Sequence, residues 1–154
     1  MKLLRSLLCF ALLGWLIGLP AQAQPMVNAR LAGQAFQLEL VDRPYSRRQG
    51  LMGREELPSG TGMLFDFPEG TTPAIWMRNM QLSLDLLFVD GAGRLVQIFA
   101  EVPPCTAVPC AIYEATQPLR FVIEVAAGTA SALRLQPGDM LDLDGYQLSS
   151  PPPF

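Results

Sequence analysis

Five side chains between residues 76 and 101 are the first candidates for chemistry in this chain, namely Trp76, Arg78, Asn79, Asp85 and Glu101. Asp85 is the most informative of them, because it stands between Leu84 and Leu86 in an otherwise apolar segment. An isolated buried carboxylate is too costly to keep ionised, so it needs a cation or several backbone donors. Arg78 precedes it by seven residues. The sequence therefore favours an ion pair between Arg78 and Asp85 that fixes the crossing of two strands.

Two functional interpretations compete with this ion pair. In the first, Arg78, Asn79 and Asp85 line a pocket beside Trp76, since guanidinium and amide donors next to a large aromatic ring suit a sugar or a carboxylate ligand. In the second, Asp85 and Glu101 form a two-carboxylate site of the glycosidase kind, which requires both side chains to face one cleft. Trp76 also fits an apolar core, and Glu101 also fits a solvated strand end.

The residue types that are missing narrow the chemistry further. The chain has no His, and its single Lys is Lys2. The usual Ser-His-Asp, Cys-His and Ser-Lys catalytic arrangements and His-ligated zinc or copper sites therefore cannot be built from the rest of the chain. The acidic residues Asp139, Asp142 and Asp144 do not match a calcium-binding EF-hand loop. We expect no cofactor and no metal.

The amino terminus has the three-part layout of a secretory signal peptide. A basic start with Lys2 and Arg5 is followed by an apolar run over residues 7–19 and by a small-residue cleavage site at 21–23. The apolar run is shorter than the roughly 20 residues that span a bilayer, so we expect cleavage after Ala23 and no stable membrane insertion. The protein is then periplasmic or secreted.

The charge balance bears on the class of partner. Without Lys2 and Arg5, the 11 basic residues fall to nine against 14 acidic residues, which gives a net charge of −5. Binding to a nucleic acid takes clustered cations. Arg47 and Arg48 are adjacent, but the other arginines are scattered along the chain. We therefore expect no nucleic-acid partner.

Two cysteines remain after the signal peptide, Cys105 and Cys110. In an exported protein an even number of cysteines indicates a disulfide, and the short loop between them contains Pro109. The main expectation is a structural disulfide that fixes the shape of this loop. A labile redox switch and metal binding by two thiolates are the alternatives, although the C-x-x-C spacing of thioredoxin-like sites is absent.

Short apolar segments between turn signals predict an α+β fold that is mostly β. We expect a leader segment without a clear period at 24–34, a single domain at 35–148 and a Pro-rich disordered tail at 149–154. The domain is expected to be a compact curled antiparallel sheet or a small barrel-like structure with two short helices. The expected strands are 35–41, 62–67, 74–77, 83–89, 95–100, 120–125 and 140–143, with a hairpin loop at 90–93, a short helix capped by Ser46 and a helix at 129–135.

Several ordered motifs together point to a known family. They are R-Q-G-L-M-G-R at 48–54, G-M-L-F at 62–65, W-M-R-N at 76–79, L-D-L-L-F-V-D at 84–90, P-C at 104–105 with Cys110, F-V-I-E-V at 121–125, Gly128, and G-D at 138–139. On these residues the chain resembles the bacterial and archaeal family known as domain of unknown function 192. Members of that family often carry Lys in place of Arg78 and Thr in place of Met80. The resemblance implies a small β-rich fold, and it supplies no catalytic residue.

The sequence as a whole favours a non-catalytic binding or accessory module. Its partner would be a small polar ligand or an envelope protein, with Trp76, Arg78, Asn79, Asp85 and Glu101 as the candidate ligand-binding residues. One alternative is a carboxylate-dependent hydrolase or lyase that uses Asp85 and Glu101. The other is a structural envelope protein without a ligand site.

Overall fold

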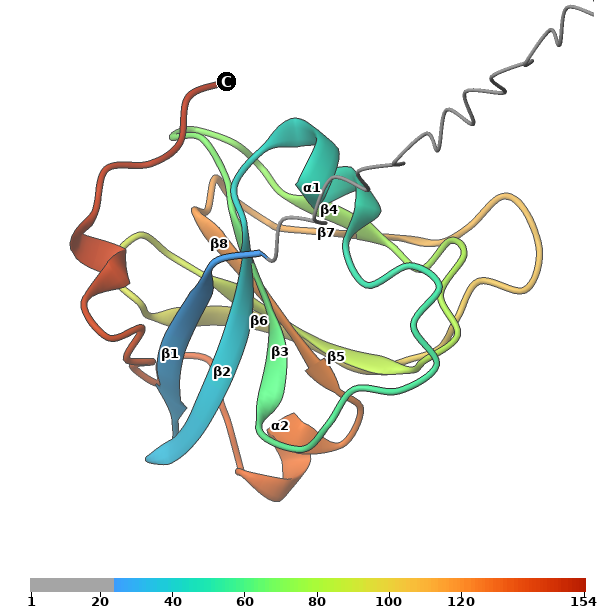
Figure 1. Cartoon of the computed structure of the whole chain (residues 1–154), viewed down its shortest axis with the longest axis horizontal. Coiled ribbons are helices and arrows are strands. Elements are labelled where there is room, and N and C mark those ends of the chain that lie inside the picture. Colours follow the sequence, from blue (N-terminus) through green and yellow to red (C-terminus); the bar gives the residue numbers. More distant parts are fainter. Residues whose placement is uncertain (1–23) are drawn as a thin grey trace, which may run out of the picture.

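The computed structural model describes residues 24–154, so the expected signal peptide lies outside the described residues. The main element is a six-stranded sheet (Figure 1). Its strands, in spatial order, are β1 (Met26–Leu31), β2 (Gln34–Val41), β3 (Thr61–Asp66), β8 (Phe121–Ala126), β5 (Leu84–Val89) and β6 (Leu95–Val102). A second, two-stranded sheet pairs β4 (Ala74–Trp76) with β7 (Ile112–Glu114). The helices are α1 (Pro44–Gln49), α2 (Thr129–Ala132) and a 3-10 turn, η1 (Tyr146–Leu148).

The main sheet is mixed and strongly curled. Strands β2 and β3 run parallel, and the other neighbours in the sheet are antiparallel. Residues 140–142 reach both edges, since Asp142 bridges Arg30 of β1 and Met140 bridges Arg94 just before β6. These isolated bridges do not close the sheet into a barrel. The prediction of a mostly β fold with two short helices is confirmed. The sheet is mixed and not purely antiparallel as predicted, because β2 and β3 run parallel, and the barrel-like alternative is not formed.

The main sheet is buried on both faces, and this explains why its central strands β3, β8 and β5 are mainly apolar. On one face, here the α2 face, Leu87 and Ile123 pack with Ala130 of α2. On the other, here the α1 face, Val122 packs with Leu51, which follows α1. Alternate residues of a strand point to opposite faces. A polar side chain on β5 or β8 must therefore enter one of two apolar layers.

The first strand differs from the prediction of a leader segment without a period. Residues Val27, Ala29 and Leu31 are buried in alternation with exposed neighbours. They pair with β2 in register from Met26 to Leu31. This alternation over six residues is short and contains Ala29, so the sequence signal is weak. The strand forms because β2 offers a partner and the α2 face offers a core.

The remaining predicted elements are found with shifted bounds. The hairpin at 90–93 joins β5 to β6 as expected, while residues 140–143 make only bridges in place of a full strand. Helix α1 starts at Pro44, ahead of the expected Ser46, because proline suits the first helical turn and the Ser46 hydroxyl accepts the Arg43 N–H at 3.2 Å. Residues 149–154 contain no helix or strand, and their disorder stays a prediction.

Candidate functional site

Asp85 is a structural residue, and the predicted ion pair with Arg78 is wrong. Its side chain is completely buried. The carboxylate accepts the backbone N–H groups of Glu101 at 2.7 Å, Gly128 at 3.2 Å and Ala130 at 2.7 Å. Backbone N–H groups therefore stabilise the Asp85 carboxylate, and no cation is needed. No ion pair joins Arg78 to Asp85 in the described part of the chain.

The position of Asp85 follows from a bulge between β5 and β6. Leu84 pairs with Val102 and Leu86 pairs with Phe99, so two residues of β6 lie opposite the single residue Asp85. One of the two, Glu101, has a φ of 51° and turns its N–H toward the carboxylate. A bulge leaves backbone groups without ladder partners. Asp85 supplies the missing acceptor and ties the bulge to the first turn of α2.

We expect Asp85→Asn to destabilise the fold by about 1–3 kcal/mol, because the amide keeps only one acceptor oxygen for buried N–H groups. The free energy of unfolding, measured in urea, checks this value. Asp142→Asn is the control, since Asp142 is exposed. An Asp85→Asn protein as stable as the native protein would contradict the structural role.

The other predicted residues fall into two groups. The Arg78 guanidinium lies over the exposed Trp76 ring, 5.6 Å from its centroid, and the Asn79 carbonyl accepts the Gly53 N–H at 3.1 Å. Trp76, Arg78 and Asn79 therefore share one region of the surface. Glu101 is exposed on β6, whereas Asp85 is completely buried. Because Asp85 has no exposed surface, the two carboxylates do not face a shared cleft.

Glu124 is a buried carboxyl group that lines a pocket, and it was not among the residues predicted from the sequence. Glu124 is on the central strand β8, with only 4% of its surface exposed. Its register neighbours, Met63 of β3 and Leu86 of β5, are apolar and buried. Neither an ion pair nor a side-chain hydrogen bond to Glu124 is found among residues 24–154. The carboxyl thus sits in the apolar layer of the α1 face without a protein partner.

The pocket beside Glu124 has a volume of about 210 Å³ and mainly apolar walls. Trp76 of β4 forms part of it, and so does Phe65 of β3. The other walls come from α1, the loop that follows it, the end of β3, β4 itself and the segment after β4. They include Arg47, Arg48, Gly50, Met52, Phe67, Ile75 and Met80. Of the five residues predicted for a site, Trp76 alone lines this pocket.

The loop after α1 is held tightly over the pocket. Gly50 has a φ of +48°, and a Cβ there would lie only 3.2 Å from Cζ of Phe65. Any larger residue would be strained and would press on the ring. The Gly53 N–H then donates to the Asn79 carbonyl, which joins this loop to the segment that carries Met80. The close approach of Gly50 to the Phe65 ring and the Gly53–Asn79 hydrogen bond thus fix the position of this loop.

Burial sets the protonation state of Glu124. The loss of hydration raises its pKa to about 8, well above the ordinary value for a glutamate, because the charged form is disfavoured in an apolar layer. At neutral pH the group is therefore mostly a neutral carboxylic acid. Such a group can donate one hydrogen bond and accept others. It resembles the buried acids that proteins use at functional sites more than a surface carboxylate.

A comparison with known protein families identifies the family of this chain. The sequence profile of the DUF192 family, described as "Uncharacterized ACR", matches residues 27–143. The chain belongs to the DUF192 family. The resemblance read from the motifs is thus confirmed. A search of curated proteins found no match.

Two crystal structures are similar to this DUF192 domain. A candidate transcription regulator from Sinorhizobium meliloti 1021 is 32% identical with a TM-score of 0.73, and the match covers 81% of this chain and 98% of that one. A protein of unknown function from Novosphingobium aromaticivorans DSM 12444 is 30% identical with a TM-score of 0.68, covering 76% and 83% of the two chains. The fold is therefore shared by proteins from different bacteria.

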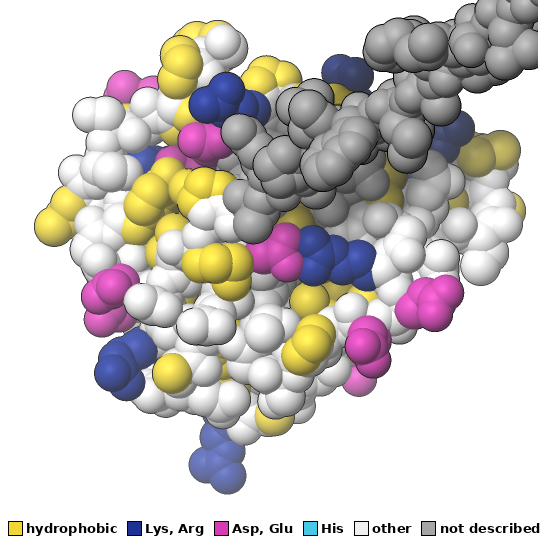
Figure 2. Space-filling view, in the orientation of Figure 1, with side chains coloured by type: hydrophobic (Ala, Val, Ile, Leu, Met, Phe, Trp, Pro, Cys, Tyr) yellow, Lys and Arg dark blue, Asp and Glu magenta, His cyan; other side chains and the backbone are white. Residues whose placement is uncertain are grey.

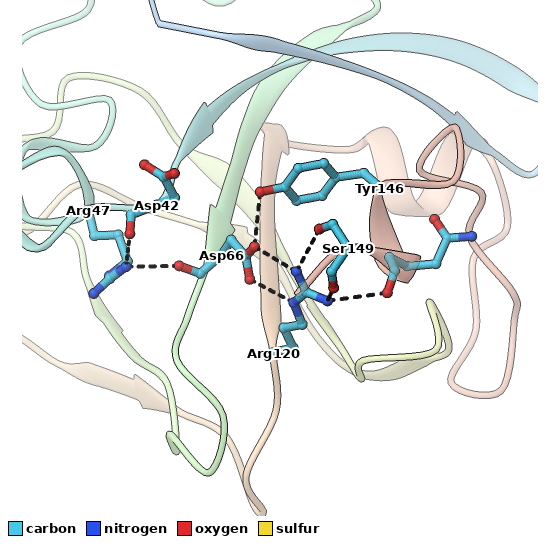
Figure 3. Close-up of polar contacts among 7 residues, drawn as sticks. Asp42, Arg47, Asp66, Arg120, Tyr146 and Ser149 are labelled. Atoms are coloured by element: carbon cyan, nitrogen blue, oxygen red, sulfur yellow. Dashed lines mark hydrogen bonds and ion pairs between the residues drawn. The ribbon is translucent and has the colours of Figure 1, made fainter. Parts of the chain in front are cut away.

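A second buried charge in this DUF192 domain is fully paired. Arg120 forms two hydrogen bonds of 2.9 Å to the Asp66 carboxylate, and Tyr146 donates to the same carboxylate at 3.0 Å (Figure 3). Arg120 also donates to the carbonyls of Gln147 at 3.2 Å and Ser149 at 2.7 Å. Burial and the Asp66 charge raise the pKa of Tyr146 to about 12. This network fastens η1 to the sheet and leaves no free group for chemistry.

The cysteine loop is attached to the segment that follows β4. Cys105 and Cys110 form the expected disulfide, with their Cα atoms 5.6 Å apart. The Cys105 N–H donates to the Met77 carbonyl at 3.0 Å, directly after the strand that carries Trp76. Among residues 24–154, no group of three or more acidic, Cys or His side chains is placed to hold a metal ion. Helices of the described residues also lack the length and apolar character needed to cross a membrane.

Proposed function

We propose that this DUF192 domain is an exported, non-catalytic module that binds a small molecule in the Glu124 pocket. The observation that carries the proposal is Glu124 itself, a buried carboxyl at a pocket, to which the side chains of residues 24–154 offer no hydrogen bond or ion pair. Asp66 and Asp85, the other buried acids, are both satisfied. A ligand group that hydrogen-bonds to Glu124 would give this carboxyl a partner and would fix the orientation of the ligand.

The pocket walls favour a ligand with an apolar body. Trp76 and Phe65 offer aromatic surface, and Met52 and Met80 are adaptable thioether side chains. A volume of about 210 Å³ is below the roughly 300–1,000 Å³ of most ligand pockets, so the bound part of the ligand is small. Binding sites of this kind combine apolar walls with a few polar groups that fix orientation.

The alternatives have less support. A hydrolase that uses Asp85 and Glu101 requires an accessible Asp85, which the structure does not provide. The similar Sinorhizobium meliloti protein carries the name of a transcription regulator, but the net charge of −5 expected for this chain after signal cleavage does not favour DNA. On the face drawn in Figure 2 the basic side chains are separated from one another. The disulfide is consistent with an oxidising compartment such as the periplasm.

A thermal-shift screen tests the proposed function. The purified, oxidised protein is heated with sugars, cell-wall fragments, organic acids and amines, alongside Trp76→Ala and the control Glu114→Gln, whose side chain is exposed on β7. A ligand at about 100 times its dissociation constant should stabilise the native protein by about 2.7 kcal/mol. We expect this shift to vanish in Trp76→Ala and to remain in Glu114→Gln. Hits that survive in a folded Trp76→Ala protein would place binding elsewhere, and a screen without hits would favour the structural envelope role.

A further inference from the structure

The wall of the Glu124 pocket contains an arginine whose charge is held in place without a carboxylate partner. Arg47 of α1 lines the pocket, and its guanidinium lies 5.4 Å from the centroid of the Phe67 ring. One of its terminal nitrogens, Nη1, donates to the backbone carbonyls of Asp42 at 2.5 Å and Asp66 at 2.9 Å. Figure 3 shows these two contacts at the end of the buried network. Two carbonyls and a ring thus fix the guanidinium.

The remaining donors of Arg47 are unused. An arginine has five N–H donors, and the contacts within the described chain engage Nη1 alone. The ion pairs among residues 24–154 do not include Arg47, and the Asp66 carboxylate is taken up by Arg120 and Tyr146. Desolvation lowers the pKa of Arg47, more than the nearby charges of Asp42 and Asp66 raise it. A partly desolvated cation of this kind is stabilised by an anion.

A second arginine adds to the positive charge. Arg48, the next residue of α1, also lines the pocket, its side chain is exposed, and it has no ion-pair partner among the described residues. The one carboxyl group among the lining residues is Glu124. The pocket therefore has two cations and an acid that is mostly neutral at pH 7, set around an apolar interior. The net charge of the lining residues is therefore positive, although the chain as a whole is acidic.

We propose that the ligand of this pocket is a small organic anion, with its carboxylate on Arg47 and Arg48 and its apolar body against Trp76 and Phe65. Guanidinium groups bind carboxylates with charge-assisted hydrogen bonds, which are stronger than those between neutral groups. Glu124 then meets a second polar group of the ligand. This inference rests on the proposed binding function and specifies its ligand class.

Benzoate and benzamide form a matched pair of probes, since they share size and ring and differ in charge. Binding to the purified protein at pH 7 is measured by ligand-observed NMR titration. The variants are Arg47→Gln and Arg48→Gln, with Arg43→Gln as the control, because the Arg43 side chain is 86% exposed and lies outside the pocket lining. Circular dichroism shows whether each variant is folded. Arg48→Gln keeps the test valid if Arg47→Gln unfolds, since Arg48 has no ion-pair partner among the described residues.

We expect the native protein and Arg43→Gln to bind benzoate about tenfold more tightly than benzamide, which is about 1.4 kcal/mol. In Arg48→Gln, and in a folded Arg47→Gln, this preference should fall to about twofold or less. Equal or tighter binding of benzamide to the native protein would overturn the anion inference and leave the pocket as a site for neutral ligands. Binding of neither probe would also overturn it, while the screen with Trp76→Ala still decides whether the pocket binds anything.

Discussion

Replacing Glu124 by Gln should remove a pH dependence of stability that the native protein shows in the range from pH 5 to 8. The folded state holds this proton with a pKa of about 8, whereas in the unfolded chain the group has its ordinary value of 4.5. Between these two values the folded protein binds one proton more than the unfolded chain. The free energy of unfolding of the native protein should therefore fall as the pH rises through this range, by up to about 1.4 kcal/mol per pH unit.

The sign of the effect is opposite to that of a paired carboxylate. Raising the pKa of an acid means that the folded state tolerates the neutral form and resists the charged one. The stability that the neutral form contributes is fully present below about pH 4.5 and is lost as the pH approaches about 8. Gln is neutral throughout and has nearly the same shape. We expect the free energy of unfolding of Glu124→Gln to exceed that of the native protein by roughly 4 kcal/mol at pH 8 and by less than about 1 kcal/mol at pH 5.

Urea unfolding at half-unit steps from pH 5 to 8.5 measures the two curves. Glu114→Gln serves as the control, because it removes an exposed acid from β7 and should keep the slope of the native protein. If native and Glu124→Gln curves run parallel across the range, Glu124 does not hold the proton. A ligand that pairs with Glu124 should change this slope in the native protein only, which links the stability measurement to the proposed binding site.

Arg120→Met should destabilise the fold by about 3–5 kcal/mol, because it leaves the Asp66 carboxylate buried without its cation. Asp66 has no exposed surface, and both of its oxygens accept hydrogen bonds from Arg120. The substitution also releases the carbonyls of Gln147 and Ser149 and thus the attachment of η1. Met preserves the apolar length of the side chain, so the loss reports mainly on charge and hydrogen bonds.

A second pair in the same chain provides a matched comparison. Arg54 and Glu39 also form a bidentate ion pair, in which each terminal guanidinium nitrogen lies 2.5 Å from a carboxylate oxygen. Their side chains, however, are 37% and 24% exposed. Arg54→Met should cost about 1 kcal/mol or less, because solvent screens the pair and rehydrates the partner left behind. Denaturant unfolding of both variants tests the contrast. Similar losses in the two would show that burial is not what makes the Asp66–Arg120 pair important.

The double variant Asp66→Leu with Arg120→Met tests whether the stability lost in Arg120→Met comes from the buried carboxylate that it leaves unpaired. Replacing both partners by apolar residues removes the uncompensated charge, so the double variant should be more stable than Arg120→Met alone. Tyr146 then loses its acceptor as well, and this limits the recovery. A double variant less stable than the single one would mean that the carboxylate has other partners that matter more than Arg120.

Local patterns predicted much of this fold. The apolar run of β5, the Asp90 to Gly93 turn and the alternation in β2 are set by neighbouring residues, so their types and approximate bounds could be read from the chain. The cysteine pair is separated by five positions and could likewise be predicted as a disulfide. Partners far apart in the chain could not. The β2–β3 pair is parallel, and residues 140–142 reach both edges of the sheet, which depends on contacts across the whole domain.

The candidate site shows the same division. The reasoning that singled out Asp85, a lone acid among apolar residues, applies equally to Glu124 in F-V-I-E-V. The two residues differ in the face that they enter. On β5, Leu87 and Val89 belong to the α2 face, so Asp85 points there and meets the backbone N–H groups of α2. On β8, Val122 belongs to the α1 face, so Glu124 points to the pocket.

The sequence by itself determined the family, the β-rich class, the disulfide, and the absence of histidine and of any lysine after Lys2. These depend on residue identity and on short spacings. Only the tertiary structure decided that Asp85 is satisfied by backbone donors and that Glu124 has no side-chain partner among residues 24–154, because the environment of a buried acid comes from strands and loops distant in sequence. The face of the sheet on which an acid lies, and not its neighbours in the chain, makes one a scaffold residue and the other a candidate for binding.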